Sequence, residues 1–136
     1  MNDFSVLVVD DDQVVREIAK FAFDEYAADR KCSVRVVEAA TTAEGLEALA
    51  KSSFDLIVSD VNFDLKDKYN KDGIEFVKAA RAMGYKGKIV ACSSSSGFER
   101  EALSAGANKF VSKAYLTNLM NSSDEAVIAE YASWLT

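Results

Sequence analysis

Near its N-terminus the chain reads Val6-Leu7-Val8-Val9-Asp10-Asp11-Asp12, four consecutive large apolar residues followed by three carboxylates. An unbroken apolar run of this length predicts a parallel strand that is covered on both faces, because a half-exposed strand would alternate apolar with polar residues. The acids then lie just beyond the C-terminal end of the strand, at the edge where open α/β sheets bind their ligands. This stretch therefore predicts both the class of fold and the place of a functional site.

A second apolar run also ends in an acid, because Leu56-Ile57-Val58-Ser59 is followed directly by Asp60. Further short apolar runs predict strands at residues 33–40, 88–92 and 109–113. Between the strands, apolar residues recur every three or four positions and predict helices at residues 14–26, 42–50, 74–83, 98–105 and 124–135. Strands and helices in this alternation form a parallel sheet with right-handed crossovers and helices on both faces.

The alternation predicts an α/β fold with a single doubly wound five-stranded parallel sheet of strand order 2-1-3-4-5, the flavodoxin-like (βα)5 arrangement. In this order the topological switch point falls between the first and third strands, which end in Asp10 and Asp60. Two strands thus deliver carboxylates to one edge of the sheet.

Short polar stretches predict where the helices begin. Asp12 is suited to cap the first helix. Thr41 and Glu44 form a capping box before the second helix, in which each side chain bonds the backbone amide of the other, and residues 122–125 form another before the last helix. Residues 114–121, by contrast, are expected to be irregular.

Composition excludes several functional classes. The 136 residues accommodate one domain, and the net charge of −6 is opposite to the basic face that a nucleic-acid surface needs. No stretch reads as a signal peptide or a membrane span, so a cytoplasmic protein is expected. Histidine is absent, which rules out a Ser/His/Asp triad and a histidine metal site. Cys32 and Cys92 are too far apart for a CxxC motif and are expected to be buried free thiols.

Charged or reactive side chains follow four of the predicted strands, namely Asp10 with Asp11, Asp60, Ser93 and Lys113. Two like charges about 4 Å apart repel by roughly 4 kcal/mol at an effective dielectric constant near 20, so clustered carboxylates favour a bound divalent cation. Oxygen ligands with open positions suit Mg²⁺, which keeps water ligands and takes phosphate oxygens. The pattern therefore predicts a site for Mg²⁺ and a phosphoryl group.

This combination resembles the receiver domain of bacterial two-component response regulators, in the stand-alone form of chemotaxis regulators, and the resemblance covers nearly the whole chain. It implies that Asp10 and Asp11 organise Mg²⁺ and that the carbonyl oxygen of Asn62 completes the metal site. It also implies that Asp60 is both a metal ligand and the nucleophile that becomes an acyl phosphate.

The later strands carry the rest of the family pattern. Ser93 corresponds to the residue that binds a phosphoryl oxygen, Lys113 to the lysine that pairs with it, and Phe110 to the switch aromatic. The resemblance implies one receiver domain over residues 1–136, no output domain, and no enzymatic activity beyond its own phosphorylation and dephosphorylation. The implied partners are a histidine kinase or phosphotransfer protein and a downstream protein target, without direct nucleic-acid binding or membrane insertion.

The chain departs from the family pattern in three places. Asp64 stands where the family usually carries a proline, and Asp72-Gly73 follows Asp60 several residues later than usual, after a long polar loop. Ala114 replaces the proline that usually follows the family lysine with a cis bond. A cis bond before alanine costs roughly 3 to 4 kcal/mol, so we expect a trans Lys113–Ala114 bond, with the ammonium still reaching Asp60.

Two alternatives belong to other functional classes. The stretch Asp10-Asp11-Asp12-Gln13-Val14 also fits the nucleophile motif of haloacid-dehalogenase-type phosphatases, with Asp10 as nucleophile and Asp12 as general acid. That family needs a further acidic pair after its lysine, whereas Asp124-Glu125 follows no apolar strand, and Asp60 would have no role. The other alternative is a receiver-like interaction module that no longer takes phosphate, which the intact set of site residues disfavours.

Overall fold

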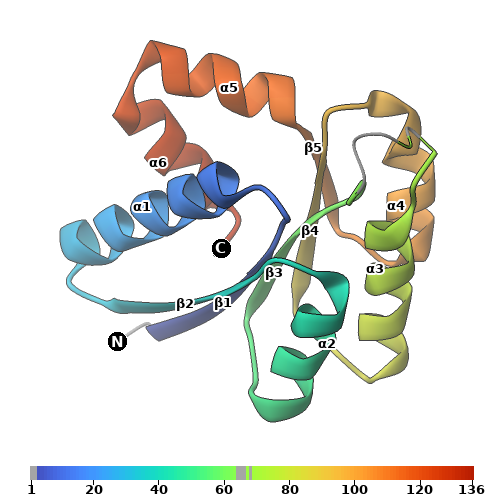
Figure 1. The fold of residues 1–136 in the computed structure, drawn as a ribbon. Coiled ribbons are helices and arrows are strands. Elements are labelled where there is room, and N and C mark those ends of the chain that lie inside the picture. The colour runs from blue at the N-terminus through green and yellow to red at the C-terminus, as the bar shows by residue number, and fades with distance from the viewer. Residues whose placement is uncertain (1–2, 64–66, 68) are drawn as a thin grey trace.

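The computed structural model describes residues 3–63, 67 and 69–136. Five parallel strands form one sheet in the order β2-β1-β3-β4-β5 (Figure 1). They are β1 (Asp3–Val9), β2 (Ser33–Ala39), β3 (Leu56–Asp60), β4 (Lys88–Ser93) and β5 (Lys109–Ser112). The doubly wound α/β fold that the sequence predicts is confirmed.

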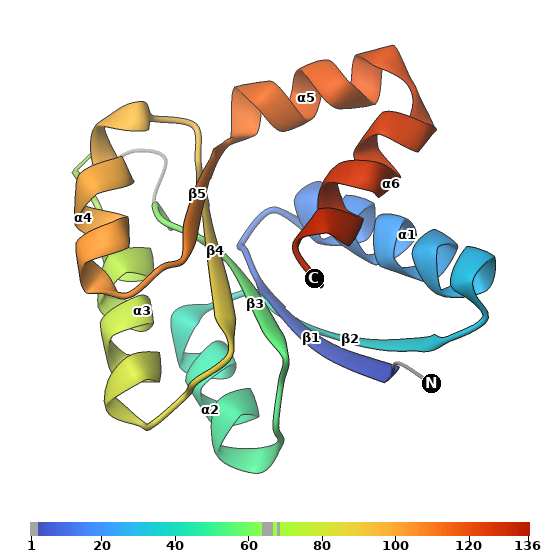
Figure 2. The same ribbon diagram turned by 180° about the vertical axis from the view of Figure 1, so that it is seen from behind.

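Helices cover both faces of this sheet (Figure 1 and Figure 2). They are α1 (Gln13–Arg30), α2 (Thr42–Lys51), α3 (Asp72–Ala82), α4 (Glu99–Ala105), α5 (Lys113–Ser122) and α6 (Asp124–Ser133), with a 3₁₀ turn η1 (Ser96–Phe98) before α4. Helices α2, α3 and α4 lie on one face, and α1 and α6 lie on the other. Helix α5 leads away from the end of β5, and α6 turns back to pack on α1.

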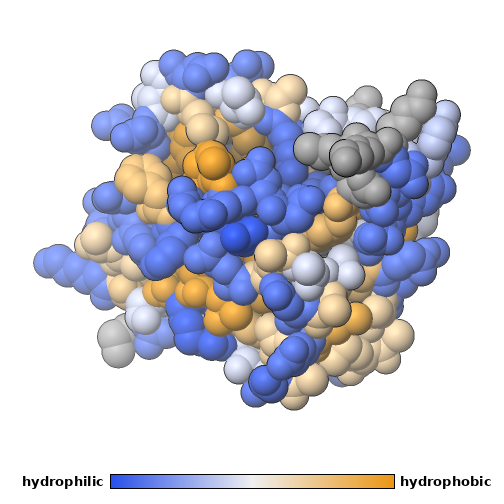
Figure 3. Space-filling model, in the orientation of Figure 1, coloured by the Kyte–Doolittle hydropathy of each residue, from blue (hydrophilic) through white to orange (hydrophobic). Residues whose placement is uncertain are grey.

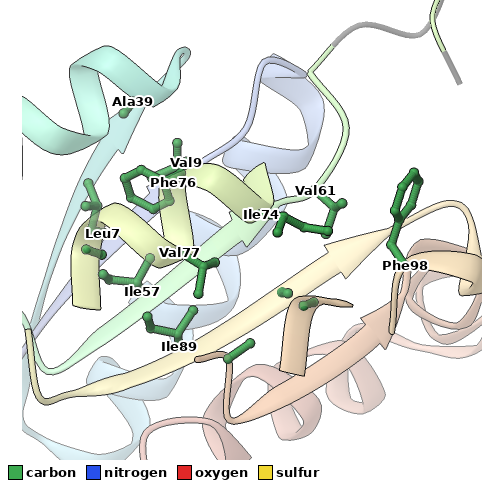
Figure 4. Close-up of a cluster of buried hydrophobic side chains, with 14 of the residues drawn as sticks. Leu7, Val9, Ala39, Ile57, Val61, Ile74, Phe76, Val77, Ile89 and Phe98 are labelled. Atoms are coloured by element: carbon green, nitrogen blue, oxygen red, sulfur yellow. The ribbon is translucent and has the colours of Figure 1, made fainter. Parts of the chain in front are cut away.

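Side chains of the central strands alternate between two hydrophobic cores, because successive residues of a strand point to opposite faces. Leu7, Val9 and Ile57 belong to the core beneath α2, α3 and α4, which is drawn in Figure 4. Val6 and Val8 belong to the core beneath α1 and α6. Each of these five side chains is at most 1% exposed. The apolar run is unbroken because both of its faces are buried.

The sequence prediction is wrong for residues 114–121, which form most of helix α5 instead of an irregular segment. Ser112 caps this helix, since its Oγ accepts a hydrogen bond from the amide of Ala114 at 3.2 Å. Leu116 is buried against the core beneath α1 and α6, and Leu119 packs on the edge of that core. Two such residues are too short a pattern to predict a helix. The described residues therefore contain six α-helices, where the sequence predicts five.

Both helices with a predicted capping box have a side-chain cap, but the reciprocal bond of each box differs from the prediction. Thr41 caps α2, and its Oγ1 accepts from the amide of Glu44 at 3.1 Å, as predicted. The Glu44 carboxylate, however, accepts from the amide of Ala40 at 2.8 Å. The cap of α6 is Ser123, whose Oγ accepts from the amide three residues later at 3.1 Å. The helix is thus capped one residue later than predicted, and the box predicted at 122–125 does not form, because Ala126 has no carboxylate to bond the backbone in return.

On the face of the molecule that Figure 3 shows, hydrophilic side chains lie beside apolar patches. Cys32 and Cys92 are free thiols, but only Cys92 is buried, since Cys32 is half-buried beside the end of α1. Among the helices of the described ranges, none is long and apolar enough to cross a membrane.

Candidate functional site

The C-terminal ends of the central strands carry three buried polar side chains. Asp10 directly follows β1, while Asp60 and Ser93 are the last residues of β3 and β4. They are 2%, 4% and 1% exposed, in that order. Lys113 follows β5 as the first residue of α5. All four residues therefore lie at the same edge of the sheet.

Lys113 bridges two of the carboxylates. Its Nζ lies 3.0 Å from Asp10 Oδ2 and 3.1 Å from Asp60 Oδ1. The described residues contain no cis peptide bond, so the bond between Lys113 and Ala114 is trans, as expected. The ammonium thus reaches both acids without the proline that usually follows this lysine in the family.

Backbone amides hold the same carboxylates. The amide of Asp12 donates to Asp10 Oδ1, and the amide of Val61 donates to Asp60 Oδ1, both at 2.9 Å. Asp12 in turn caps α1, because its Oδ1 accepts from the amide of Val14 at 2.9 Å. Hydrogen bonds to ionised acceptors are short and strong. The orientation of each carboxylate is therefore set by the protein before any ligand binds.

Arg16 contacts this site, although no motif in the sequence identifies it. Its Nη1 donates to the carbonyl oxygen of Asp10 at 2.8 Å, and its Nε pairs with Glu38 Oε1 of β2 at 3.2 Å. The guanidinium thereby ties the turn between β1 and α1 to the neighbouring strand. The signal in the sequence is one arginine in the first turns of a helix, which is too common a feature to be recognised.

Lys113 does not fully offset the cost of holding two buried carboxylates in their charged forms. Burial, followed by the charge of Asp10, raises the pKa of Asp60 to about 7, although Lys113 acts in the opposite direction. Burial also raises the pKa of Asp10. Burial lowers the pKa of Lys113, but the charges of Asp60 and Asp10 outweigh it and raise that pKa overall. The site therefore favours an additional positive charge.

The acids fit a divalent cation. One carboxylate oxygen from each of Asp10, Asp11 and Asp60 lies within 4.8 Å of the others. Asp11 is exposed while the other two are buried, so the cluster is open to solvent on one side. Hard oxygen donors with an open side suit Mg²⁺, which retains water ligands and accepts phosphate oxygens. A bound cation would also supply the charge that Lys113 alone does not.

Asn62, whose carbonyl oxygen is the remaining expected metal ligand, follows Asp60 by two residues and is half-buried. Its side-chain amide donates to the carbonyl oxygen of Asp67 at 3.1 Å, which joins it to the loop after β3. Its role as a ligand stays a prediction. Asp64, at the position where the family usually has proline, lies outside the described residues.

A hollow of about 520 Å³ lies between the loop after β3 and the segment after β4, and its lining includes Asn62, Tyr69, Lys71, Ser93, Phe98 and Glu101. Lys71 and Glu101 form an ion pair at 2.9 Å that joins the loop to α4. Ser93 Oγ accepts a hydrogen bond from the amide of Ser95 at 3.0 Å. The hollow thus leads from the surface to the serine at the end of β4.

Phe110, the expected switch aromatic, lies on β5 opposite Ala91 of β4. It is half-buried and packs on the edge of the core beneath α2, α3 and α4. With Tyr115 and Glu130 it also lines a second hollow of about 430 Å³. Its ring therefore borders both a core and an open space, while its role as a switch stays a prediction.

The family model of the response regulator receiver domain matches residues 6–123. The match covers most of the chain, which therefore belongs to the response regulator receiver family. Membership in this family replaces the phosphatase alternative, and Asp12, the general acid of that alternative, instead caps α1 through its Oδ1. No curated protein matches the sequence.

Solved structures of receiver domains share the fold. The chemotaxis response regulator CheY4 of Vibrio cholerae has a TM-score of 0.75 at 23% identity, over 99% of this chain and 100% of that chain. The Francisella response regulator 1452 receiver domain has a TM-score of 0.71 at 22% identity, over 97% and 96% of the two chains. The Thermotoga maritima response regulator TrrA, in complex with Mg²⁺-BeF, has a TM-score of 0.64 at 22% identity, over 80% and 85%. At these identities the likeness establishes the fold.

Proposed function

We propose that this chain is a phosphoacceptor signalling domain that takes a phosphoryl group onto Asp60 with Mg²⁺ and thereby changes its protein contacts. The position of the Asp60 carboxylate carries the proposal. It is 4% exposed at the end of β3, lies 3.1 Å from the Lys113 ammonium, and shares the carboxylate cluster with Asp10 and Asp11. Positioning and charge neutralisation of this kind provide most of the rate in phosphoryl transfer.

The phosphoryl donor is proposed to be a phosphohistidine on a partner histidine kinase or phosphotransfer protein, since this chain has no histidine. An oxygen of Asp60 forms the new bond to phosphorus while the P–N bond of the donor breaks. The electron pair of the broken bond stays on the imidazole nitrogen, which takes a proton from solvent. Asp10, Asp11, Asp60 and the carbonyl oxygen of Asn62 would hold Mg²⁺, which would supply charge neutralisation at the phosphoryl oxygens when bound.

The chain's own groups prepare the nucleophile and receive the product. A pKa of about 7 leaves Asp60 partly protonated near neutrality, so a nearby cation that favours the charged form also favours the reactive form. Lys113 is placed to pair with negative charge as it passes from the carboxylate to the phosphoryl group. Ser93, at the end of the neighbouring strand, is proposed to bind a phosphoryl oxygen. Hydrolysis of the acyl phosphate by water returns the Asp60 carboxylate and inorganic phosphate.

Ser93 and Phe110 are proposed to carry the signal toward the surface. When the phosphoryl group draws the Ser93 hydroxyl inward, the vacated space admits the Phe110 ring, so phosphorylation biases a choice between two packings. We expect Ser93→Ala to accept phosphate but to lose most of the phosphorylation-dependent change in affinity for its target, measured by titration. An unchanged affinity shift would remove Ser93 from the mechanism.

The output is proposed to be contact with a downstream protein target, through the face that α4, β5 and the following helices form. Phe110 and the hollow of about 430 Å³ beside it lie on this face, which supports the proposal. The net charge of −6 is consistent with a protein target and disfavours direct nucleic-acid binding. A cytoplasmic location stays part of the same proposal.

Incubation with acetyl phosphate and Mg²⁺, followed by peptide mapping, tests the proposed function. The expected result is a label on Asp60. A label on Asp10 with repeated turnover of the donor would support the phosphatase class instead. A protein that binds Mg²⁺ yet takes no label would support the receiver-like interaction module.

A further inference from the structure

The first turn of helix α5 is attached at two places. Lys113, its first residue, lies 3.0 Å from Asp10 and 3.1 Å from Asp60. Two residues later, Tyr115 Oη donates a hydrogen bond to Glu130 Oε1 of α6 at 3.1 Å. The position of this turn is therefore set by two carboxylate anchors, one in the phosphoacceptor site and the other in the last helix.

Glu130, the second anchor, contacts three side chains, those of Tyr115, Trp134 and Lys109. Its Oε2 accepts a hydrogen bond from Trp134 Nε1 at 3.0 Å and lies 3.4 Å from Lys109 Nζ of β5. The hydrogen bond to Glu130 raises the pKa of Tyr115, as expected for a hydroxyl that donates to a carboxylate. The Glu130 side chain is 14% exposed, and Trp134 is 1% exposed within the core. A change at the first turn of α5 can thus reach the single tryptophan of the chain through one carboxylate.

Phosphorylation of Asp60 would change the first anchor. A phosphoryl group adds about −1.5 to −2 charges and strong acceptor oxygens, so Lys113 exchanges a contact shared between two carboxylates for one with the phosphoryl group. The backbone of Lys113 belongs to the helix, and its carbonyl oxygen accepts a hydrogen bond from Thr117 Oγ1 at 3.0 Å. Movement of Lys113 is therefore transmitted to the whole first turn, including Tyr115.

Helix α5 is suited to such a movement because one side of it packs on the protein. It buries Leu116, whereas Tyr115 and Met120 are 47% and 40% exposed. Because α5 buries few side chains, the contact between Tyr115 and Glu130 contributes to where the helix lies.

We propose that the Tyr115–Glu130 hydrogen bond holds α5 in its resting position and that phosphorylation draws the first turn away from it, which makes Glu130 a positioning residue that reports the state of Asp60 to the C-terminal helices. This inference rests on the proposed phosphorylation of Asp60. The same hydrogen bond borders the hollow beside Phe110, so its release also reshapes that face.

Beryllofluoride with Mg²⁺, as a mimic of the phosphoryl group, tests the inference in a calorimetric titration. Coupling between two sites is reciprocal, so removing a contact that favours the resting position must strengthen beryllofluoride binding. Tyr115→Phe removes only the hydroxyl and is expected to bind beryllofluoride about fivefold more tightly or better, which is the lower end of usual coupling. Its resting Trp134 fluorescence is expected to shift toward that of the activated wild type.

Tyr85→Phe is the matched control. It removes a hydroxyl that donates to the carbonyl oxygen of Lys88 at 3.2 Å, at the opposite edge of the sheet, so it is expected to bind like the wild type. The inference is overturned if Tyr115→Phe binds beryllofluoride no more tightly than Tyr85→Phe while Asp60 is still labelled by acetyl phosphate. It is also overturned if bound beryllofluoride leaves the wild-type Trp134 emission unchanged. A wild type that neither binds beryllofluoride nor takes a label would overturn the proposed function, and this inference with it.

Discussion

The acidic and the basic halves of the site are built in different ways. Asp10 and Asp60 lie at the C-terminal ends of strands with neighbours on both sides, are at most 4% exposed, and accept hydrogen bonds from backbone amides. Lys113 follows the edge strand β5, has a side chain that is 23% exposed, and begins a helix that leads away from the sheet. The sheet thus holds the acids in place, whereas the position of the cation depends on a peripheral helix.

This difference suggests that the two halves of the site have different roles. Groups that must meet a metal ion in one geometry are attached to the most rigid part of the fold. The group that responds to added negative charge is attached to an element that can be displaced at small cost, because low local stability is found where few apolar contacts are buried.

The most severe test of the acidic half is Asp60→Asn. Asparagine keeps the size of the side chain but lacks the nucleophilic carboxylate, so labelling by acetyl phosphate is expected to be lost completely while circular dichroism stays unchanged. Asp12→Asn is the matched control, because asparagine also caps helices well and this variant should still be labelled. A label that persists in Asp60→Asn would place the nucleophile elsewhere.

A pair of alanine variants separates the two halves. Asp11→Ala removes one anionic ligand from a hydrated site and is expected to lose Mg²⁺ binding and labelling together. Lys113→Ala leaves all three acids in place, so it should retain Mg²⁺ binding while its response to phosphorylation weakens. Calorimetric titration with Mg²⁺ measures the first effect in both variants. Undiminished Mg²⁺ affinity in Asp11→Ala would show that the metal site is elsewhere, and lost affinity in Lys113→Ala would show that the halves are not separable.

The acidic half should also make the stability of the metal-free protein depend on pH. An unfolded chain releases the Asp60 proton near its usual pKa of 3.8, whereas the folded chain retains it up to about 7. The folded state binds more protons between these values, so this carboxylate lowers the free energy of unfolding as pH rises through the window. Asp60→Asn resembles the protonated form, so its free energy of unfolding should match that of the wild type at the acid end and exceed it by on the order of 4 kcal/mol above the window. Urea unfolding with a chelator measures the difference, and a difference independent of pH would contradict the expectation.

The smallest effects compare the helices that begin beside each half. Asp12 caps α1 with a hydrogen bond of 2.9 Å, and Ser112 caps α5 with one of 3.2 Å. Asp12→Ala is expected to lower the free energy of unfolding by about 1 kcal/mol, because α1 packs on the core and forms with the whole domain. Ser112→Ala should lower the free energy of unfolding of the domain by about half as much, but it should accelerate amide hydrogen exchange within α5. If urea unfolding shows the same decrease in the free energy of unfolding for both variants, both helices unfold together with the core.

The acidic half could be predicted from local patterns. An unbroken apolar run that ends in acids occupies only a few adjacent residues, and the hydrophobic effect forces such a run into the middle of a sheet. The strand order then brings Asp10 and Asp60 to one edge. The cap at Asp12 is equally local, because it depends on a side chain and an amide two residues later.

By itself, then, the sequence determined the class of fold, the strand order and the edge at which the site lies, because local patterns indicate each strand and helix, and their alternation along the chain restricts how the sheet is built. Only the tertiary structure decided that Lys113 begins a helix, since Leu116 stabilises that helix by packing on distant parts of the chain. It also decided the contact between Arg16 and Glu38, and the one between Tyr115 and Glu130, whose partners are separated by 22 and 15 positions. Polar contacts across such separations leave no periodic pattern, because they depend on how the helices and strands are placed against one another.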